Sequence, residues 1–319
     1  MSDNMKNNIW LIGSGTMAIE YINVLDALKV NYQVIGRGID SAKKCELKTK
    51  VKVVTGGVES HIFDCKDFPS EAIVTVGVEQ LASVTKILLQ NGVKKILVEK
   101  PGGLDHNEIS SVLAETKKQN AEVYIAYNRR FYASTQKAQE IINDDGGALS
   151  FNFEFTEWSH QIVDIEKASG VKEKWLLANS THVIDLAFFL GGKPKEIACY
   201  VAGGLSWHPS GSIFAGAGIS ENGALFSYQA NWEAPGRWGV EVLTKKHRLI
   251  FRPMETLQMM RKGSVKIESV EIDDRLDKEF KPGVYQQVHR FFADQTSGFC
   301  TLDEQLSLWD VYCRMAGYP

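Results

Sequence analysis

The first 127 residues alternate short apolar runs with longer segments in which apolar residues recur every three or four positions. The runs predict strands, and the periodic segments predict amphipathic helices between them. The predicted strands are Asn8–Ile12, Tyr32–Ile35, Val51–Thr55, Ala72–Val76, Lys95–Val98 and Glu122–Ala126, and the predicted helices are Thr16–Leu28, Gln80–Asn91 and Asn107–Gln119. This alternation is typical of βαβ units, so the sequence predicts an α/β fold with a doubly wound parallel sheet.

The pattern changes after residue 147, because Ala148–Glu157 alternates apolar and polar residues in period two. Further strands are predicted at Glu196–Ala202, Gly223–Ala230, Trp238–Leu243, His247–Phe251 and Lys266–Val270, and helices at Ser180–Leu190 and Gly283–Thr296. We expect a first domain over residues 1–127 and an α+β domain with an open, mostly antiparallel sheet over 128–319. The C-terminal helix is expected to pack back on the first domain.

A glycine-rich turn follows the first predicted strand. Gly13, Gly15 and Ala18 form a G-x-G-x-x-A pattern that opens a helix. In a Rossmann domain such a turn lets a pyrophosphate approach bare backbone at the helix N-terminus, near Thr16 and Met17. The alternative is a tight strand-to-helix turn without a ligand, but the βαβ context favours a nicotinamide dinucleotide.

The end of the second strand bears on which dinucleotide is bound. An NAD site usually has an acidic residue there for the ribose 2′-hydroxyl, whereas this chain has Gly36 and Arg37. A guanidinium can pair with a 2′-phosphate, so NADP is preferred over NAD. A solvated arginine in a loop is the alternative interpretation.

Three later motifs point to a family. They are ILVEKPGG (Ile96–Gly103), AYNRRF (Ala126–Phe131) and STHVIDLAFFLGG (Ser180–Gly192). With the glycine turn, they resemble the Gfo/Idh/MocA family of NAD(P)-dependent sugar and cyclitol oxidoreductases, from Ile9 to the C-terminal helix. The resemblance implies a Rossmann domain, a catalytic lysine after the fifth strand and a catalytic histidine on a helix of the second domain.

Hydride transfer to or from a carbinol carbon also moves a proton on the oxygen, so a positioned acid or base is required. Lys100 and His182 are the two catalytic candidates. Glu99 is expected to position Lys100, and Pro101 to fix the turn, with a cis bond as one option. Asp185 either orients the imidazole of His182 or forms an ion pair on the helix.

The chain departs from the family pattern near the histidine. Family dehydrogenases usually have an aspartate four residues before it, and that position here is Ala178. Asn179 follows and can hydrogen-bond a substrate hydroxyl, but it cannot act as a base. Proton transfer therefore depends on His182 and Lys100, or on a carboxylate that the sequence does not identify.

Other residues near these motifs complete the expected site. Substrate contacts are expected from Asn179, Asp185, Arg129, Arg130 and Tyr127, and cofactor contacts from Gly13, Gly15, Thr16, Met17, Arg37, Val76, Glu99, Lys100 and Asn128. One of the two arginines is expected to bind a substrate carboxylate or phosphate, although surface charge is the alternative. Trp158, Trp175 and Tyr127 either stack on a sugar ring or pack in the core.

The predicted function is hydride transfer between nicotinamide and a sugar or sugar-nucleotide hydroxyl or carbonyl, with surface-glycan or aminosugar biosynthesis as the expected setting. The alternative is a non-catalytic dinucleotide sensor on the same scaffold. The net charge of −3, from 36 basic and 39 acidic residues, argues against nucleic acid. No metal site is expected, because the five cysteines lack zinc-like spacing.

The polar N-terminus MSDNMKNN and the lack of a long apolar stretch predict a cytoplasmic protein with no membrane partner. An open sheet exposes one broad face, which a second copy of the chain would cover. We therefore expect a homodimer or homotetramer that acts on a small, sugar-like molecule.

Overall fold

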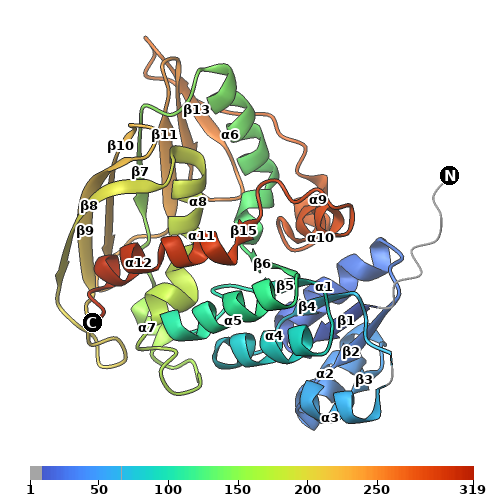
Figure 1. Ribbon diagram of the computed structural model, residues 1–319. Coiled ribbons are helices and arrows are strands. Elements are labelled where there is room, and N and C mark those ends of the chain that lie inside the picture. The colour runs from blue at the N-terminus through green and yellow to red at the C-terminus, as the bar shows by residue number, and fades with distance from the viewer. Residues whose placement is uncertain (1–8, 66) are drawn as a thin grey trace. The chain divides into compact units, whose positions relative to one another are not determined.

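The computed structural model describes residues 9–65 and 67–319. The N-terminal octapeptide, including Asn8 at the predicted start of the first strand, lies outside the described residues. The chain divides into two compact units (Figure 1). The first extends to Tyr127 and also includes Val284–Ser307, and the second comprises Asn128–Gly283 and Leu308–Pro319.

The first unit is built on a seven-stranded sheet in the order β15-β6-β5-β4-β1-β2-β3. Its strands are β1 (Ile9–Ile12), β2 (Tyr32–Ile35), β3 (Val53–Val54), β4 (Glu71–Val74), β5 (Lys95–Glu99), β6 (Glu122–Ala126) and β15 (Cys300–Thr301). Strands β1 to β6 pair in parallel, and β15 runs antiparallel to β6. The predicted α/β class with a doubly wound parallel sheet is confirmed.

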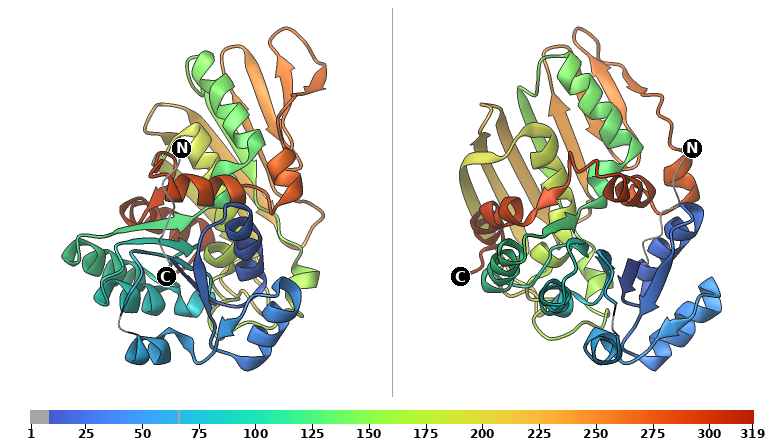
Figure 2. Two further views of the ribbon diagram at one scale, coloured as in Figure 1. Left: turned by 90° about the vertical axis from the view of Figure 1, so that its right-hand side faces the viewer. Right: turned by 45° about the vertical axis from the view of Figure 1, so that its right-hand side comes forward.

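Helices cover both faces of this sheet. They are α1 (Thr16–Ala27), α2 (Ile39–Thr49), α3 (Gly57–Asp64), α4 (Leu81–Gln90) after the 3₁₀ turn η1 (Val78–Gln80), α5 (His106–Lys118), α10 (Val284–Phe292) and α11 (Leu302–Ser307). Helix α1 packs against α2 and α10, and α4 packs against α5. Figure 2 shows α1 and α4 on opposite sides of the strands, as right-handed crossovers require.

A buried lysine joins the returning segment to the first unit. Lys95 at the start of β5 forms an ion pair with Asp294, and its ammonium lies 4.7 Å from the centre of the Phe291 ring. Glu71 adds a second carboxylate 3.7 Å away. Because a buried cation is costly without partners, these contacts fix α10 and the turn after it to the sheet.

The second unit contains an eight-stranded sheet in the order β14-β13-β12-β11-β7-β10-β9-β8. Its strands are β7 (Ser150–Glu154), β8 (Pro194–Ala202), β9 (Ile213–Ser220), β10 (Leu225–Asn231), β11 (Gly239–Leu243), β12 (His247–Phe251), β13 (Gln258–Arg261) and β14 (Ile267–Ser269). Only the β7–β10 pair is parallel. The predicted open, mostly antiparallel sheet is therefore confirmed.

The two longer helices of the second unit, α6 (Ala133–Asp144) and α8 (Thr181–Gly191), lie on one face of this sheet (Figure 2). The other helical segments of this unit are η2 (Asn128–Phe131), α7 (Ser159–Ile162), a π-helical turn η3 (Leu176–Ser180), α9 (Arg275–Glu279) and α12 (Trp309–Ala316). Phe188 of α8 meets Phe153 of β7 edge to face at 5.6 Å, and Phe153 stacks on Tyr228 of β10 at 5.5 Å. Aromatic side chains thus form the core between α8 and the sheet.

Strand β9 was not predicted from the sequence, because four small residues, Ala215–Gly218, interrupt the bulky residues that mark strands. The structure explains the glycines. A Cβ on Gly216 would come within 2.5 Å of the Tyr228 ring, and one on Gly218 within 2.6 Å of the Phe226 ring. The glycines therefore make room for the aromatic residues that face them on β10.

No helix within residues 9–65 and 67–319 combines the length and apolar character that crossing a bilayer demands.

Candidate functional site

The glycine turn after β1 has two different requirements for glycine. Gly13 has φ +124°, and a Cβ there would lie 2.8 Å from the carbonyl oxygen of Thr75. Gly15 has an ordinary φ of −83°, and a Cβ added to it would meet nothing within 4 Å. Gly13 is thus needed by the fold itself, whereas the space beside Gly15 is open and suits a ligand that approaches the backbone.

Helix α1 begins directly after this turn, with Thr16 and Met17 as its first residues. Gly15 occupies the N-cap position and supplies no side-chain acceptor, and the first helical turn contains no acidic residue. The first N–H groups of a helix have no intrahelical partner, and the helix dipole places positive potential there. Free N–H groups and positive potential are what a dinucleotide needs at this turn, so these features fit a bound pyrophosphate.

The turn lies where the strand order reverses. β1 pairs with β2 on one side and with β4 on the other, so the sheet has its topological switch point between β1 and β4. Because β1 to β6 are parallel, Gly13, Arg37, Val76 and Lys100, which follow β1, β2, β4 and β5, lie at one edge of the sheet. Open α/β sheets bind ligands at this edge, next to the switch point.

Arg37 follows β2 as an exposed side chain, and among the described residues no carboxylate is paired with it. Its neighbour Gly36 packs closely, since a Cβ there would lie 2.6 Å from the hydroxyl of Ser14 in the glycine turn. The backbone at the end of β2 therefore runs directly beside the turn. Arg37 is placed where the residue that distinguishes the two adenosine riboses stands in Rossmann domains.

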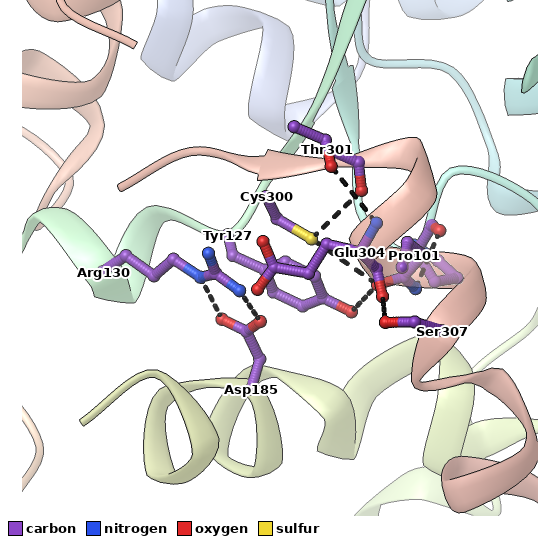
Figure 3. Close-up of polar contacts among 9 residues, drawn as sticks. Pro101, Tyr127, Arg130, Asp185, Cys300, Thr301, Glu304 and Ser307 are labelled. Carbon is purple, nitrogen blue, oxygen red and sulfur yellow. Dashed lines mark hydrogen bonds and ion pairs between the residues drawn. The ribbon is translucent and has the colours of Figure 1, made fainter. Parts of the chain in front are cut away.

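Lys100 lies in a turn that is fixed on both sides. The Lys100–Pro101 peptide bond is cis, as the sequence analysis allowed. Glu99 accepts a hydrogen bond from the Tyr21 hydroxyl at 2.9 Å. The carbonyl of Pro101 accepts one from Gln305 at 3.1 Å (Figure 3). These contacts hold the backbone around the lysine while Lys100 itself stays partly exposed.

Tyr127 and Asn128, both expected at the site, use their polar groups within the fold. The buried Tyr127 hydroxyl donates to Gln305 at 3.2 Å, which links the end of β6 to the Lys100 turn. The side-chain amide of Asn128 is also buried and donates to the carbonyl of Pro282 at 2.9 Å. Both residues therefore have structural contacts of their own.

His182 is the second residue of α8 in the second unit, and the π-helical turn η3 directly precedes it. The imidazole is partly exposed, and its centre lies 6.2 Å from the Trp238 ring. Such π-helical turns are rare and occur frequently at functional sites. The local backbone thus gives His182 an unusual setting for a helical residue.

A carboxylate that was not predicted from the sequence lies beside this turn. Glu157 is only 2% exposed, and one of its oxygens accepts hydrogen bonds from Asn179 at 2.9 Å and Ser180 at 2.7 Å. Its other oxygen lies 3.9 Å from the Arg237 guanidinium. Glu157 continues the inward-facing register of Phe153 and Phe155, so a charged residue in a buried register was the signal that could have identified it.

Arg130 and Asp185 bind each other. Two guanidinium nitrogens of Arg130 donate to the two carboxylate oxygens of Asp185 at 2.8 and 2.5 Å (Figure 3). Both side chains are buried, at 3% and 0% exposed. Asp185 therefore forms an ion pair, and this pair lies in the interior rather than on the helix surface.

Two of the three aromatic candidates pack into the fold. Trp175 is buried and meets Trp207 edge to face at 6.0 Å, and Tyr127 is buried in the first unit. Trp158 is 42% exposed, donates to the carbonyl of Gly236 at 3.0 Å and carries the Arg237 guanidinium 4.6 Å above its ring. Trp158 alone among these three keeps a substantial exposed surface.

No protein-family model matches the sequence, and no curated protein matches it. Solved structures do match. UDP-N-acetylglucosamine 3-dehydrogenase from Acidithiobacillus ferrooxidans superposes with a TM-score of 0.76 at 14% identity, over 98% of this chain and 97% of that one. Levoglucosan dehydrogenase in complex with NADH superposes with a TM-score of 0.79 at 16% identity, over 98% of this chain and 96% of that one.

An oxidoreductase from Agrobacterium radiobacter, solved with NAD⁺, L-tartaric acid and magnesium, gives a TM-score of 0.78 at 12% identity, over 97% and 94% of the two chains. The chain shares the fold of these oxidoreductases. At this level of identity the likeness concerns the fold and extends over nearly the whole length of each protein.

Proposed function

We propose that the protein is an NAD(P)-dependent oxidoreductase that acts on a hydroxyl or carbonyl group of a sugar or sugar nucleotide. The observation that carries the proposal is the open, uncapped glycine turn at the switch point of a parallel sheet. The similar structures include a sugar-nucleotide dehydrogenase and a sugar dehydrogenase with NADH bound. A role in surface-glycan or aminosugar biosynthesis agrees with that substrate class.

The bound nicotinamide would supply or accept the hydride, and the protein would move the accompanying proton. In our proposal Lys100 and His182 hold that proton at the substrate oxygen. Glu157 provides the carboxylate that Ala178 lacks, because it is hydrogen-bonded to the two residues at the end of η3. It acts as a positioning residue that fixes this turn and adds negative charge near the start of α8.

Cofactor binding tests the proposal most directly. We expect wild-type protein to bind NADP more tightly than NAD in titration calorimetry, because Arg37 can pair with the 2′-phosphate. A Gly15→Val variant should bind both at least tenfold more weakly, since the new side chain occupies the open space. Its thermal stability should stay near that of the wild type, because the φ of Gly15 suits any residue.

Two results would contradict this part of the proposal. If wild-type protein binds neither dinucleotide in either redox state, the reaction has no hydride source. If Gly15→Val binds as tightly as the wild type, the ligand does not lie against this turn. A Lys52→Val variant serves as a control, because the Lys52 side chain is 94% exposed and precedes β3, at the edge of the sheet opposite the turn.

A sensor that binds the dinucleotide without chemistry is the second candidate. The absence of a carboxylate at Ala178 favoured it in the sequence. Glu157 weakens that argument, since a buried carboxylate is present at the same turn. Tight NADP binding without oxidation or reduction of any member of a broad sugar panel would favour the sensor.

We further propose that two copies of the chain pair through the outer face of the second unit's sheet. This face exposes apolar side chains on β8, β9 and β10, including Tyr200 (71% exposed), Ile213 (40%) and Leu225 (59%). Large exposed apolar patches are unusual on a monomer. Analytical ultracentrifugation at micromolar concentration should give a dimer or tetramer, and Leu225→Glu should shift it toward monomer; a wild-type monomer would contradict the proposal.

A further inference from the structure

Two neighbouring buried N–H groups of the second unit, Nε of Arg129 and Nε1 of Trp238, have no acceptor within the described part of the chain. Nε1 of Trp175 also lacks an acceptor, but its ring packs edge to face against Trp207. The guanidinium of Arg129 lies 4.7 Å from the centre of the Trp238 ring, so both donors belong to one cluster. Neither group can accept a hydrogen bond, and buried donors are almost always satisfied. A partner for them must offer acceptors.

The positive charge of Arg129 also indicates an anionic partner. No carboxylate within residues 9–65 and 67–319 forms an ion pair with Arg129, in contrast to its neighbour Arg130, which Asp185 neutralises. Burial lowers the pKa of Arg129 below its ordinary value; Tyr132 and Glu255 offset part of this effect, and the Arg237 cation adds to it. The surroundings therefore disfavour the positive charge, and an added anion would relieve this cost.

Arg237 adds a second cation on the same indole. Its guanidinium lies 4.8 Å from the centre of the Trp238 ring. The nearest carboxylate is Glu157 at 3.9 Å, which already accepts hydrogen bonds from Asn179 and Ser180. Glu255 acts on Arg129 only through longer-range attraction, from an exposed position. Within residues 9–65 and 67–319, Arg237 thus has one carboxylate within ion-pair distance and Arg129 has none.

We propose that Arg129, Trp238 and Arg237 form a subsite for an anionic group of the substrate. The group is a carboxylate or a phosphate, whose oxygens only accept hydrogen bonds and whose charge balances the two guanidiniums. This inference rests on the proposed function and narrows it, because the substrate is then an acidic or phosphorylated sugar derivative. A neutral sugar would leave the charge of Arg129 without a counter-ion.

The test compares substrates that differ in charge. NADP-dependent and NAD-dependent turnover is measured with neutral hexoses, the matching uronates, hexose 1-phosphates and nucleoside diphosphate sugars. We expect kcat/KM for at least one anionic class to exceed that for the neutral sugars tenfold or more. A preference for uronates identifies a carboxylate, and a preference for the other two classes identifies a phosphate.

The variant Arg129→Met should raise KM for the preferred anionic substrate about ten- to a hundredfold, the effect of losing a charged hydrogen bond. Turnover of neutral sugars should change little, and Arg129→Lys should recover part of the loss. Arg275→Met is the control, since its exposed side chain pairs with Asp273 elsewhere in the second unit. Thermal unfolding checks that each variant is folded.

A direct binding measurement separates this inference from the proposed function. Glucuronate and inorganic phosphate are titrated into wild-type and Arg129→Met protein, with tryptophan fluorescence as the signal. If no sugar is oxidised or reduced but the wild type binds one anion at least tenfold more tightly than Arg129→Met, the oxidoreductase fails and the subsite stands. If neither anion binds in an Arg129-dependent way and neutral sugars are used as well as anionic ones, the subsite is refuted.

Discussion

Replacing Lys100 by methionine should lower kcat about 10²- to 10⁴-fold, the usual contribution of a positioned acid or base. The sheet places this lysine at the carboxyl end of β5, and the surrounding turn is fixed by the Glu99–Tyr21 and Pro101–Gln305 hydrogen bonds. Methionine keeps the length of the side chain but carries no proton. The loss should therefore appear in turnover at saturating substrate and cofactor, measured by the change in NAD(P)H absorbance.

The control for this variant is Lys52→Met, which removes an equally charged side chain that is 94% exposed. It should retain wild-type kcat. Cofactor affinity of Lys100→Met is measured separately by calorimetry, so that a binding defect is not mistaken for a chemical one. A kcat within twofold of the wild type would remove Lys100 from the mechanism and leave proton transfer to His182.

The sequence predicted the first unit well, because buried parallel strands leave continuous apolar runs and the glycine turn has a defined steric cause. Helix α2 was not predicted from the sequence, and the reason is physical. Only Ala42 and Cys45 of its eleven residues are buried, so its apolar face is too narrow to give a clear periodic signal. The association of Val284–Ser307 with the first unit depends on the contacts of Lys95, which connect residues far apart in the chain.

In the candidate site, too, local motifs could be predicted from the sequence, whereas features that depend on tertiary contacts could not. Residues in local motifs, such as Gly13, Gly15 and Lys100, could be identified because each follows a strand directly. The roles of Arg129 and Arg130 could not be separated, since they are adjacent and chemically identical in the sequence. Their difference arises only from the tertiary structure, which gives Arg130 a carboxylate partner and places Arg129 on an indole ring.

The Arg130–Asp185 pair should matter for stability rather than for chemistry. In Arg130→Met, the Asp185 carboxylate stays at a position that is 0% exposed and loses its bidentate partner. Leaving one member of a buried ion pair uncompensated costs about 3–5 kcal/mol. Urea unfolding monitored by tryptophan fluorescence should show this as a lower midpoint, whereas Lys137→Met, which removes an exposed ion pair with Glu140, should leave the midpoint unchanged.

The double variant Arg130→Met, Asp185→Leu distinguishes the cost of an unpaired charge from the loss of the pair itself. Removing both charges eliminates the buried carboxylate, so stability should return most of the way to that of the wild type. The pair joins η2, which carries Arg129, to α8, which carries His182. If the double variant is as unstable as Arg130→Met, the guanidinium stabilises this junction through its packing on Phe189 at 4.7 Å, and the unpaired carboxylate is not the cause.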